Sequence, residues 1–552
     1  MARTRFVQLV AGATAFALFV VACAPDDEDP AEPGEEASDD DTEDAADETD
    51  DTADEPTGDL DDSATIRGVM AAGVTIETLD PDAASGGNGL RLSMPIYDRL
   101  IHMDVVTSEL EPGLAESWEF QEDNNVLQLN LREGVLFHDG AEFNAEVVEA
   151  NFERSRERED IGRRESTIAV EAVGEIEIVD DYTVRLHRAE GVELDWSLLP
   201  ARLTENLGMM MSPNVLDVEE LDRDGVGAGA WKFVEIVGDT IVYERFDDYW
   251  NPEEPMAAQL ELTSLPDDEA TFAAVVSGEQ DLAVIQAPQR DRADSEADAG
   301  RIQLFVADTL INWHLWLHHD LPPLDSLEFR QAMQHAVDRE ALVDAIQFGQ
   351  GVATVQHFPP GHFAYNEDHG IDRWGYDPDR ALELLDEAGY DGETLLIEVA
   401  TTPELRVRLA EALVAQYSEV GINVELDIVD RAERAFAFQE PPTHGFLGQR
   451  TRVDALQHLA DSYGPTASFN PAGRTVDDRT EELLTQCAEL AAGSPEWEDC
   501  LKELSGHTTE QAAQHSFFVR QETWVANPCL VGWQAPAGQQ ENWRTVGVQA
   551  DC

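Results

Sequence analysis

The stretch formed by residues 97–154 constrains the fold of this chain more than any other part of the sequence. In residues 126–131, three leucines alternate with valine, glutamine and asparagine, which is the pattern of a half-buried strand. A tight turn is predicted at residues 137–140, and Asn144 stands where a cap belongs, ahead of a helical face that includes Val148 and Phe152. The stretch therefore predicts a short helix, a hairpin and a second helix.

Other segments point to α/β structure. A helix is predicted to end at Gly389, and a strand, an amphipathic helix and a second strand at residues 396–400, 404–420 and 421–426 make a βαβ-like unit. Helices that cover a mostly parallel sheet on both faces are typical of α/β lobes. Further strands are predicted at residues 69–76, 172–187 (a hairpin), 231–237, 240–245 and 304–317.

Length and charge narrow the class of protein. A chain of 552 residues is too long for one compact core, so we expect two or three lobes. Lys and Arg number 35 against 114 Asp and Glu, which gives a formal net charge of −79. This charge repels phosphates, so we expect no nucleic-acid partner. The sequence holds no Gly-x-Ser-x-Gly elbow, no Walker-type loop and no His-Glu-x-x-His, so no enzymatic activity and no cofactor are expected.

The N-terminal residues predict export. Arg3 and Arg5 precede an apolar run over residues 6–22, which is shorter than the roughly 20 residues that a spanning helix needs. The run ends in Val-Val-Ala-Cys, which resembles a bacterial lipobox and would make Cys23 the lipidated first residue of the mature protein. The alternatives are an ordinary signal peptide cut near Ala22 or an uncleaved anchor.

Residues 24–63 consist almost entirely of Asp, Glu, Ala, Thr, Pro and Gly, without aromatic side chains. Such a segment cannot bury enough apolar surface to offset its ordering entropy, so we expect a disordered acidic tether. As a coil of about 40 residues it would span roughly 35 Å, and self-repulsion would lengthen it. A calcium site would need a spaced loop of the EF-hand kind, which this segment lacks.

Several motifs resemble those of the bacterial extracellular solute-binding proteins of the dipeptide/oligopeptide type (family 5), the ligand receptors of ABC importers. They lie at residues 78–81 (TLDP), 112–118 (PGLAESW), 131–140 (LREGVLFHDG), 225–233 (GVGAGAWKF) and 322–339 (PPLDSLEFRQAMQHAVDR). The resemblance covers residues 64–533. It implies an α/β, two-lobed fold like that of periplasmic binding proteins (class II, large type), with an inserted α+β domain and a central ligand cleft.

The same resemblance implies a domain plan and a function. Lobe I would comprise residues 64–95, 200–305 and 520–552, the accessory domain residues 96–199 and lobe II residues 306–519. The protein would be a monomer on the outer face of the cell membrane, periplasmic or at the cell surface. It would capture a peptide or another small polar solute and deliver it to the permease and ATPase subunits of an importer. The alternatives are a receptor for an opine, oligosaccharide or chelate, a sensor-linked receptor, and an exported hydrolase.

In the family, a loop after the TLDP turn lies beside the ligand. In this chain that loop would contain Ser85, Gly86, Gly87 and Asn88. A glycine-rich polar loop lets the backbone approach a bound molecule closely, so these residues are predicted to bind the ligand. A solvent-exposed turn is the alternative.

Specificity is predicted to depend on residues 446–470. In peptide-binding members a segment here carries an Asp that pairs with the peptide ammonium group. Aligning Asp454 with the second acidic residue of that segment puts Thr451 at the ammonium-binding position, next to Gln449, Arg450 and Arg452. A neutral residue between two arginines disfavours an ordinary α-peptide and favours a carboxylate or a neutral polar solute. The alternative is that both arginines are solvated surface charges.

Histidines and tryptophans near residue 316 supply further candidates. His318 stands where many family members have Asn, and Trp313 and Trp316 point to opposite faces of the predicted strand, so at most one faces the cleft. Core packing is the alternative for both tryptophans. His314 and His318, with His319, would suit a metal on a helix, but the alternation around them indicates a strand, and no third ligand is evident. No metal site is therefore expected.

Four cysteines follow Cys23, namely Cys487, Cys500, Cys529 and Cys552. An even number in an exported chain predicts two disulfides. Proximity in sequence favours pairing the first with the second and the third with the fourth, although four cysteines allow three pairings.

Overall fold

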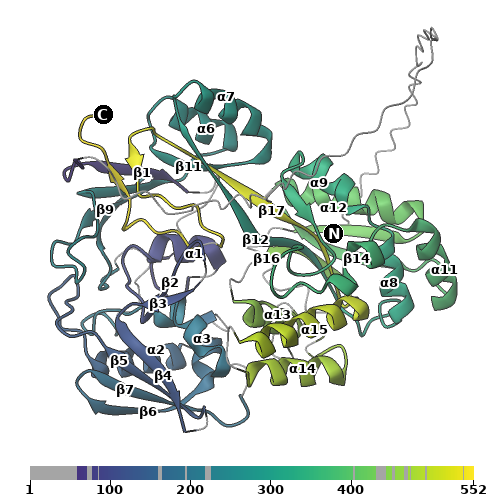
Figure 1. Ribbon diagram of the computed structural model, residues 1–552, viewed down its shortest axis with the longest axis horizontal. Helices are drawn as coiled ribbons and strands as arrows, with labels where there is room; N and C mark the ends of the chain where they lie inside the picture. The colour runs from purple at the N-terminus through teal and green to yellow at the C-terminus, as the bar shows by residue number, and fades with distance from the viewer. Residues whose placement is uncertain are drawn as a thin grey trace, which may run out of the picture. The chain divides into compact units, whose positions relative to one another are not determined.

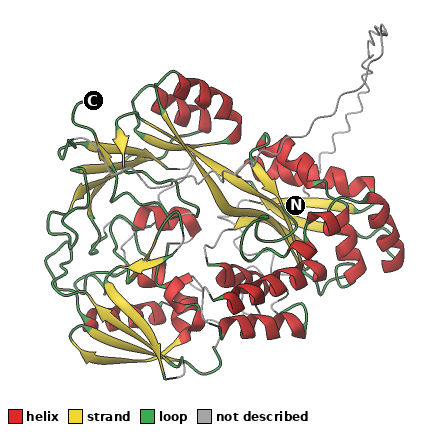
Figure 2. Cartoon of the chain, viewed as in Figure 1, coloured by secondary structure: helices red, strands yellow, loops and turns green. Residues whose placement is uncertain are grey.

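The computed structural model describes residues 59–70, 78–84, 86–107, 109–122, 124–158, 165–192, 196–217, 225–401, 404–429, 443–450, 454–464, 470, 472, 474–490, 494–538 and 540–552. Figure 2 shows helices and strands intermixed along the chain. Within the described ranges, none of the helices has the length and apolar character that a membrane crossing requires. Cys23 and the signal-peptide prediction lie outside the described residues.

A mixed sheet runs through the body (Figure 1). Among the described strands, eleven belong to it, in the order β15-β14-β16-β12-β17-β11-β1-β10-β9-β8, with β13 pairing β17 off this path. They are β1 (Thr65–Val69), β8 (Trp231–Val237), β9 (Thr240–Arg245), β10 (Gln259–Thr263), β11 (Leu282–Ile285), β12 (Gln303–Leu317), β13 (Gly351–Ala353), β14 (Thr394–Ala400), β15 (Asn423–Val429), β16 (Gly445–Arg450) and β17 (Gln514–Ala526).

The C-terminal core is the buried cluster around Trp313, Phe329 and Phe517. It lies between one end of the sheet and helices α8 (Leu327–His335), α9 (Arg339–Gln347), α11 (Pro378–Ala388) and α12 (Glu404–Glu419). Strands β14 and β15 pair in parallel and α12 connects them, so the predicted βαβ unit is confirmed. Helix α11 ends at Gly389 with φ +68°, a left-handed conformation that glycine adopts without a steric penalty, as predicted.

The N-terminal core is the cluster that contains Ile66, Trp231 and Trp524. It packs on β1 and β8–β11 and includes α1 (Gly86–Ser93), while α6 (Asp268–Val276) and α7 (Arg290–Asp298) form a smaller cluster beside it. The predictions for β8 and β9 are confirmed. Strand β1 ends at Val69, where it pairs with β10 and β11. Most of the strand predicted at residues 69–76 lies outside the described residues.

Strands β12 and β17 connect these two cores. They are fifteen and thirteen residues long and pair antiparallel over most of their length. Phe517 of β17 belongs to the C-terminal core, whereas Trp524 of the same strand belongs to the N-terminal core. The register shifts between Asp308 and His314, and such an irregularity increases the local twist of a strand pair. Both cores are therefore built on one continuous pair of strands.

The accessory core is the cluster around Leu127, Phe152 and Leu203, which draws on residues from Leu100 to Ala228. Its sheet has the order β4-β5-β7-β6 and is covered by α2 (Ala145–Glu157) (Figure 1). The other strands and short helices near it are β2 (Ile101–Met103), β3 (Leu110–Pro112), β4 (Ala115–Gln121), β5 (Val126–Leu131), α3 (Glu165–Ala169), β6 (Val173–Asp180), β7 (Thr183–Arg188), α5 (Leu199–Arg202) and the 3-10 turn η3 (Asn206–Gly208).

The hairpin and the second helix predicted in residues 97–154 are confirmed as β4, β5 and α2. The Asn144 side-chain oxygen accepts a hydrogen bond from the Val147 amide at 3.1 Å, and Gly140 adopts φ +84° in the predicted turn. The short helix predicted at the front of the stretch was wrong. The chain there forms β2 and β3, because the buried Ile101 lies in register with Pro112 across a two-stranded ribbon.

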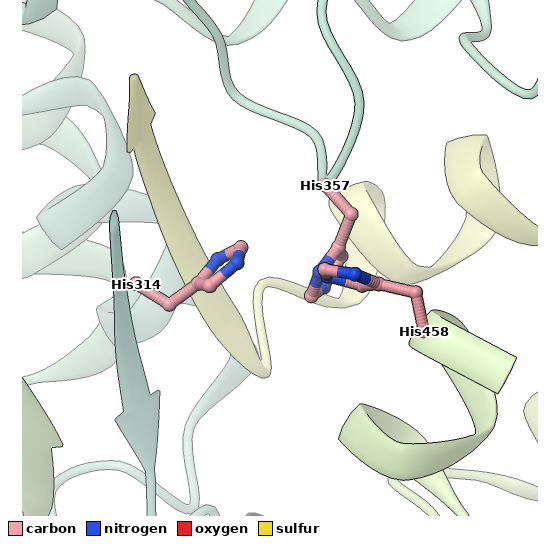
Figure 3. Close-up of side chains that lie close together, drawn as sticks. All are labelled: His314, His357 and His458. Carbon is pink, nitrogen blue, oxygen red and sulfur yellow. The ribbon is translucent and has the colours of Figure 1, made fainter. Parts of the chain in front are cut away.

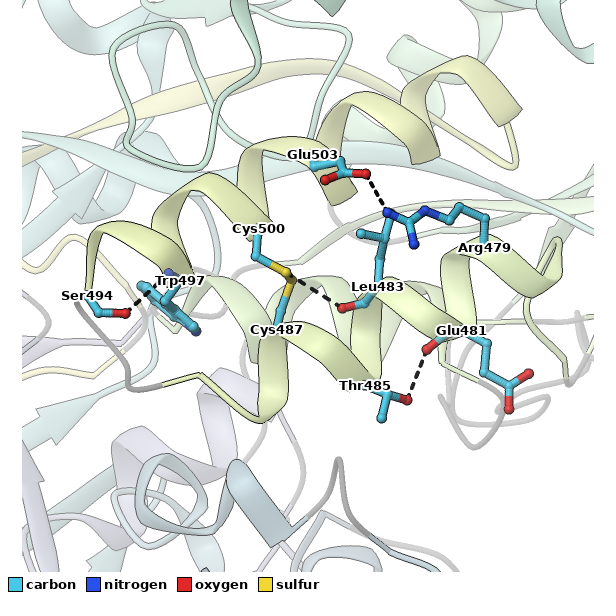
Figure 4. The surroundings of a disulfide bond; sticks show 9 residues. All are labelled: Arg479, Glu481, Leu483, Thr485, Cys487, Ser494, Trp497, Cys500 and Glu503. Carbon is cyan, nitrogen blue, oxygen red and sulfur yellow. Dashed lines mark hydrogen bonds and ion pairs between the residues drawn. A yellow bond between two sulfur atoms is a disulfide. The ribbon is translucent and has the colours of Figure 1, made fainter.

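The helical core comprises α13 (Ala455–Tyr463), α14 (Asp478–Ala488) and α15 (Pro495–Gln511), packed around Leu459 and Leu504. Figure 4 shows the Cys487–Cys500 disulfide that joins α14 to α15, with the two Cα atoms 5.6 Å apart. A second disulfide joins Cys529 to Cys552, at the C-terminus. Both favoured pairings are thus confirmed.

The described chain begins inside the fold. The Ala550 amide donates to the Asp59 carbonyl at 2.8 Å, and Leu60 forms a β-bridge with Gln549. The folded body therefore starts a few residues before the predicted limit at residue 64. The remaining short elements are η2 (Val170–Ala172), η4 (Ala287–Gln289), η5 (Glu367–His369), α10 (Ile371–Trp374), β18 (Leu530–Val531) and β19 (Gly547–Val548).

Candidate functional site

The end of β16 and the start of α13 form the centre of the candidate ligand site. Asp454 caps α13, since its side chain accepts a hydrogen bond from the Gln457 amide at 2.7 Å. Burial raises the pKa of Asp454; the Arg202 guanidinium opposes this shift and the Asp461 carboxylate adds to it. The backbone of Arg450 lies opposite Asn312 of β12. Thr451 and Arg452 lie outside the described residues.

Arg202 connects this region to the accessory core. Its guanidinium nitrogens lie 2.7 and 3.4 Å from the two carboxylate oxygens of Asp461, and both residues are buried. Arg202 ends α5, whose Leu199 packs in the accessory core, whereas Asp461 belongs to α13 of the helical core. This buried ion pair, largely shielded from water, therefore joins two separate cores next to the end of β16.

The segment that carries Arg202 also contacts the TLDP turn. The Asn206 side-chain amide donates to the carbonyl of Pro81 at 2.7 Å and to that of Ala84 at 3.3 Å. The turn before α1 and the helix after β16, which are far apart in the sequence, are thus held by the same short segment, α5 with η3. The structure brings together the two regions in which ligand contacts were predicted.

The loop prediction for Gly86, Gly87 and Asn88 was wrong in its secondary structure. These residues form the first turn of α1, and Ser85 lies outside the described residues. Glycine weakens a helix, but Leu90 and Leu92 farther along α1 are buried in the N-terminal core. Tertiary packing therefore holds a helix that local propensity disfavours. Ligand contact by these residues stays a prediction.

Charged groups fix the TLDP turn itself. Arg154 of α2 binds both Asp80, at 2.8 Å, and Asp82, and Arg158 also contacts Asp80. Burial acts to raise the pKa of Asp80, but the hydrogen bonds and charges of Arg154 and Arg158 outweigh it and lower the pKa. For Asp82, burial outweighs the arginine and raises the pKa. The two carboxylates and Arg154 hold the turn rigid on the accessory side.

Three other predicted residues lie on or just after the paired strands β12 and β16. The Oε1 atom of Gln449 is buried and finds no hydrogen-bond partner among the described residues. An unsatisfied buried acceptor costs about 1–3 kcal/mol, so a donor supplied by a ligand would stabilise it. Trp313 is fully buried in the C-terminal core, near the Arg406 guanidinium. His318 is buried, its amide donates to the His444 carbonyl at 2.8 Å, and burial lowers its pKa. Their ligand contacts stay predictions.

Arg202, Asp461 and Asn206 were not found from the sequence. Each is a single polar residue in a segment without a motif, and each acquires its role from a partner at least 122 residues away. No local pattern could have indicated them.

The comparisons with known proteins decide the family. The family described as "Bacterial extracellular solute-binding proteins, family 5 Middle" matches residues 109–455. The chain belongs to this family. The "Dipeptide-binding protein" of Escherichia coli (strain K12) is 29% identical over 485 residues, which cover 77% of this chain and 88% of that protein. Family 5 proteins are the solute receptors of ABC importers, and this chain is such a receptor.

Solved structures agree on the fold. The binding protein AgaA of A. tumefaciens R10, in complex with agropinic acid, superimposes with a TM-score of 0.76 at 20% identity and covers 88% of this chain and 99% of its own. DppA of Helicobacter pylori, in complex with the peptide STSA, gives 0.75 at 20% identity, with coverage of 88% and 98%. The predicted two-lobed α/β fold is confirmed. The relatives named are binding proteins.

Proposed function

We propose that this receptor captures a small polar solute other than an ordinary α-peptide and carries it to an importer in the cell membrane. The observation that carries the proposal is that two carboxylates of the segment after β16, the half-buried Asp454 and the buried Asp461, both have partners. Asp454 is engaged in capping α13, and Asp461 is paired with Arg202. Among the described residues of this region, these acids already have partners, and Thr451 replaces the predicted ammonium-binding acid.

A peptide ammonium group taken out of water needs a carboxylate partner, because an uncompensated charge in a dry cleft is strongly unfavourable. A solute with a carboxylate or with neutral donors avoids this penalty. Arg450, the last residue of β16, and Arg452, two residues farther along the sequence, would attract a carboxylate, and the buried acceptor of Gln449 would receive a donor from the solute. The AgaA complex with agropinic acid supports a non-peptide solute on this fold.

An α-peptide is the second candidate. It is favoured by the Escherichia coli relative, which is named a dipeptide-binding protein, and by the Helicobacter pylori protein bound to the peptide STSA. The two candidates differ in one chemical feature, the free ammonium group, so they can be separated by a matched pair of ligands.

The experiment is a thermal-shift and calorimetric screen of the purified protein. Alanyl-alanine is compared with N-acetyl-alanyl-alanine, and agropinic acid, an oligosaccharide and a metal chelate are added as non-peptide probes. A ligand at 1,000 times its dissociation constant stabilises by about 4 kcal/mol, which is readily seen. We expect stabilisation by acidic or amine-blocked solutes, weakened in Arg450→Gln and unchanged in Arg380→Gln. Stabilisation by the free-amine peptide alone would refute the argument.

We also propose the domain plan and the membrane attachment. Lobe I (residues 64–95, 200–305 and 520–552) and lobe II (residues 306–519) would close on the solute, with residues 96–199 as the accessory domain. A solute that bridges both lobes stabilises the closed state, which docks on the permease. Cys23 would carry the lipid, and residues 24–63 would hold a monomeric receptor near its permease at a high effective concentration. Cys23→Ser should move the protein from the detergent phase to the aqueous phase of a Triton X-114 partition.

A further inference from the structure

Three histidines from separate elements meet inside the protein. His314 lies on β12, His357 on the loop after β13 and His458 on α13, and all three are buried. Figure 3 shows their imidazole rings pointing toward one another. Among the described residues, they form the one group of at least three His, Cys, Asp or Glu side chains whose ligand atoms, one from each residue, lie within 4.8 Å of one another.

Hydrogen bonds at the outer edge of the cluster orient two of the rings. His314 Nδ1 lies 3.0 Å from the Ser516 hydroxyl, and His357 Nε2 lies 2.9 Å from the Tyr463 hydroxyl. When these outer nitrogens carry the protons and donate to the hydroxyls, Nε2 of His314 and Nδ1 of His357 present lone pairs inward. A hydrogen bond that fixes the tautomer of an imidazole in this way is typical of metal-binding histidines.

The inner nitrogens lie close to the spacing that a metal requires. Nε2 of His458 is 2.8 Å from Nδ1 of His357, a hydrogen bond whose proton a metal ion would displace, and one ligand atom from each of the three histidines lies within 4.8 Å of the others. Ligands at 2.0–2.1 Å from a tetrahedral ion lie about 3.3 Å from each other, so metal binding requires side-chain rotations that equalise these spacings.

We propose that His314, His357 and His458 bind a divalent transition-metal ion, with zinc as the ion that the three imidazoles fit best. Three neutral nitrogen donors suit borderline metals such as zinc, copper and nickel rather than magnesium or calcium, which prefer oxygen. A water molecule or an anion would complete the tetrahedron, and an anion would offset the cost of a buried dication. The net charge of −79 favours the approach of cations over long distances.

The histidine cluster does not depend on the solute proposed above. In the sequence, His314 stands near His318 and His319, and no third ligand is evident. The structure gives His314 two other histidines, and those two are 101 residues apart from each other in the sequence. The spacing of metal ligands along the chain therefore offered no signal.

The test measures zinc binding by the untagged, full-length protein. After treatment with EDTA and dialysis against zinc, metal content is determined by mass spectrometry, affinity by competition with a chromogenic chelator, and the ligands by X-ray absorption. We expect one zinc ion per chain with at least three imidazole nitrogens in its shell. His314→Gln and His458→Gln should each weaken binding at least tenfold. Ser516→Ala, which keeps every ligand, should weaken it about tenfold.

His187→Gln is the matched control, because His187 is partly exposed on β7 and lies outside the cluster. It should leave zinc binding unchanged. If the protein binds no zinc, the proposal is wrong. It is also wrong if all variants bind zinc equally, because the acidic segments and not the histidine cluster would then hold the metal. If a cluster variant does not fold, X-ray absorption of the wild-type protein still tests the proposal. A zinc shell of imidazole nitrogens supports it, and a shell of carboxylate oxygens overturns it.

Discussion

Replacing Arg202 by methionine should destabilise the protein far more than the loss of an exposed ion pair does. Arg202 and Asp461 are the partners that join α5 to α13, and their side chains are only 10% and 11% exposed. Methionine keeps most of the buried volume but removes the Arg202 charge from the Asp461 carboxylate. Removing one partner of a buried pair costs about 3–5 kcal/mol, because the remaining charge is desolvated and uncompensated.

The structure places the expected cost at the lower end of that range. About a tenth of each side chain still reaches solvent, so we expect Arg202→Met to lower the free energy of unfolding by about 3 kcal/mol. Asp461→Asn should have a similar effect. The double variant leaves neither charge buried, so its cost should fall short of the sum of the single costs by at least about 1 kcal/mol.

The assay is urea denaturation monitored by tryptophan fluorescence and by circular dichroism. The free energies are compared only if both signals report the same unfolding transition. Arg380→Met is the matched control: Arg380 pairs with Glu383 at 2.9 Å, but the two side chains are 40% and 67% exposed. That variant should lose no more than about 0.5 kcal/mol. Additive costs in the double variant, or an effect of Arg202→Met as small as the control, would refute a buried link between α5 and α13.

Three further predictions concern stability. Replacing both Cys487 and Cys500 by alanine opens a loop with a sequence separation of 13 and should cost about 3 kcal/mol in urea titrations; an unchanged midpoint would contradict a stabilising bridge. Asn144→Ala removes the cap of α2 and should cost about 1 kcal/mol, measured in the same way, whereas Asn144→Asp should cost less. Burial opposes ionisation of Asp98, but the hydrogen bond to His102 and the charge of Arg544 outweigh burial and lower the pKa of Asp98. Burial lowers the pKa of His102 itself to about 4, so its imidazole is neutral above that pH. The stabilising contribution of Asp98 is therefore present above about pH 4 and is lost as the pH falls toward the folded-state pKa. Asp98→Asn should flatten the decline of stability below pH 4, and an identical acid titration would show that the carboxylate is not responsible.

Local patterns in the sequence determined most of the secondary structure. Strand alternation located β5, the position of Asn144 located the start of α2, and Gly389 located the end of α11. These features depend on side chains within a few residues of one another, so a short window of sequence contains the physical cause. The pairing of the cysteines was also accessible, because each partner lies close along the chain.

Local patterns failed where packing overrode propensity. Gly86 and Gly87 predicted a loop, yet the burial of Leu90 and Leu92 draws them into α1. The front of the 97–154 stretch predicted a helix, yet pairing between β2 and β3 makes it a ribbon. In both places, the burial of apolar surface and a partner strand supply more free energy than the intrinsic preference of a few residues.

The sequence by itself therefore determined the family and the α/β class, since these follow from motifs of contiguous residues, and it predicted ligand contacts after β16. Only the tertiary structure decided that Arg202 pairs with Asp461 and that His314 meets His357 and His458. Contacts of this kind depend on how separate segments pack. The sequence around a polar residue in a segment without a motif does not indicate which distant residue it will contact. The ion pair and the histidine cluster are products of the fold, whereas the turns, caps and strands that position them are encoded locally.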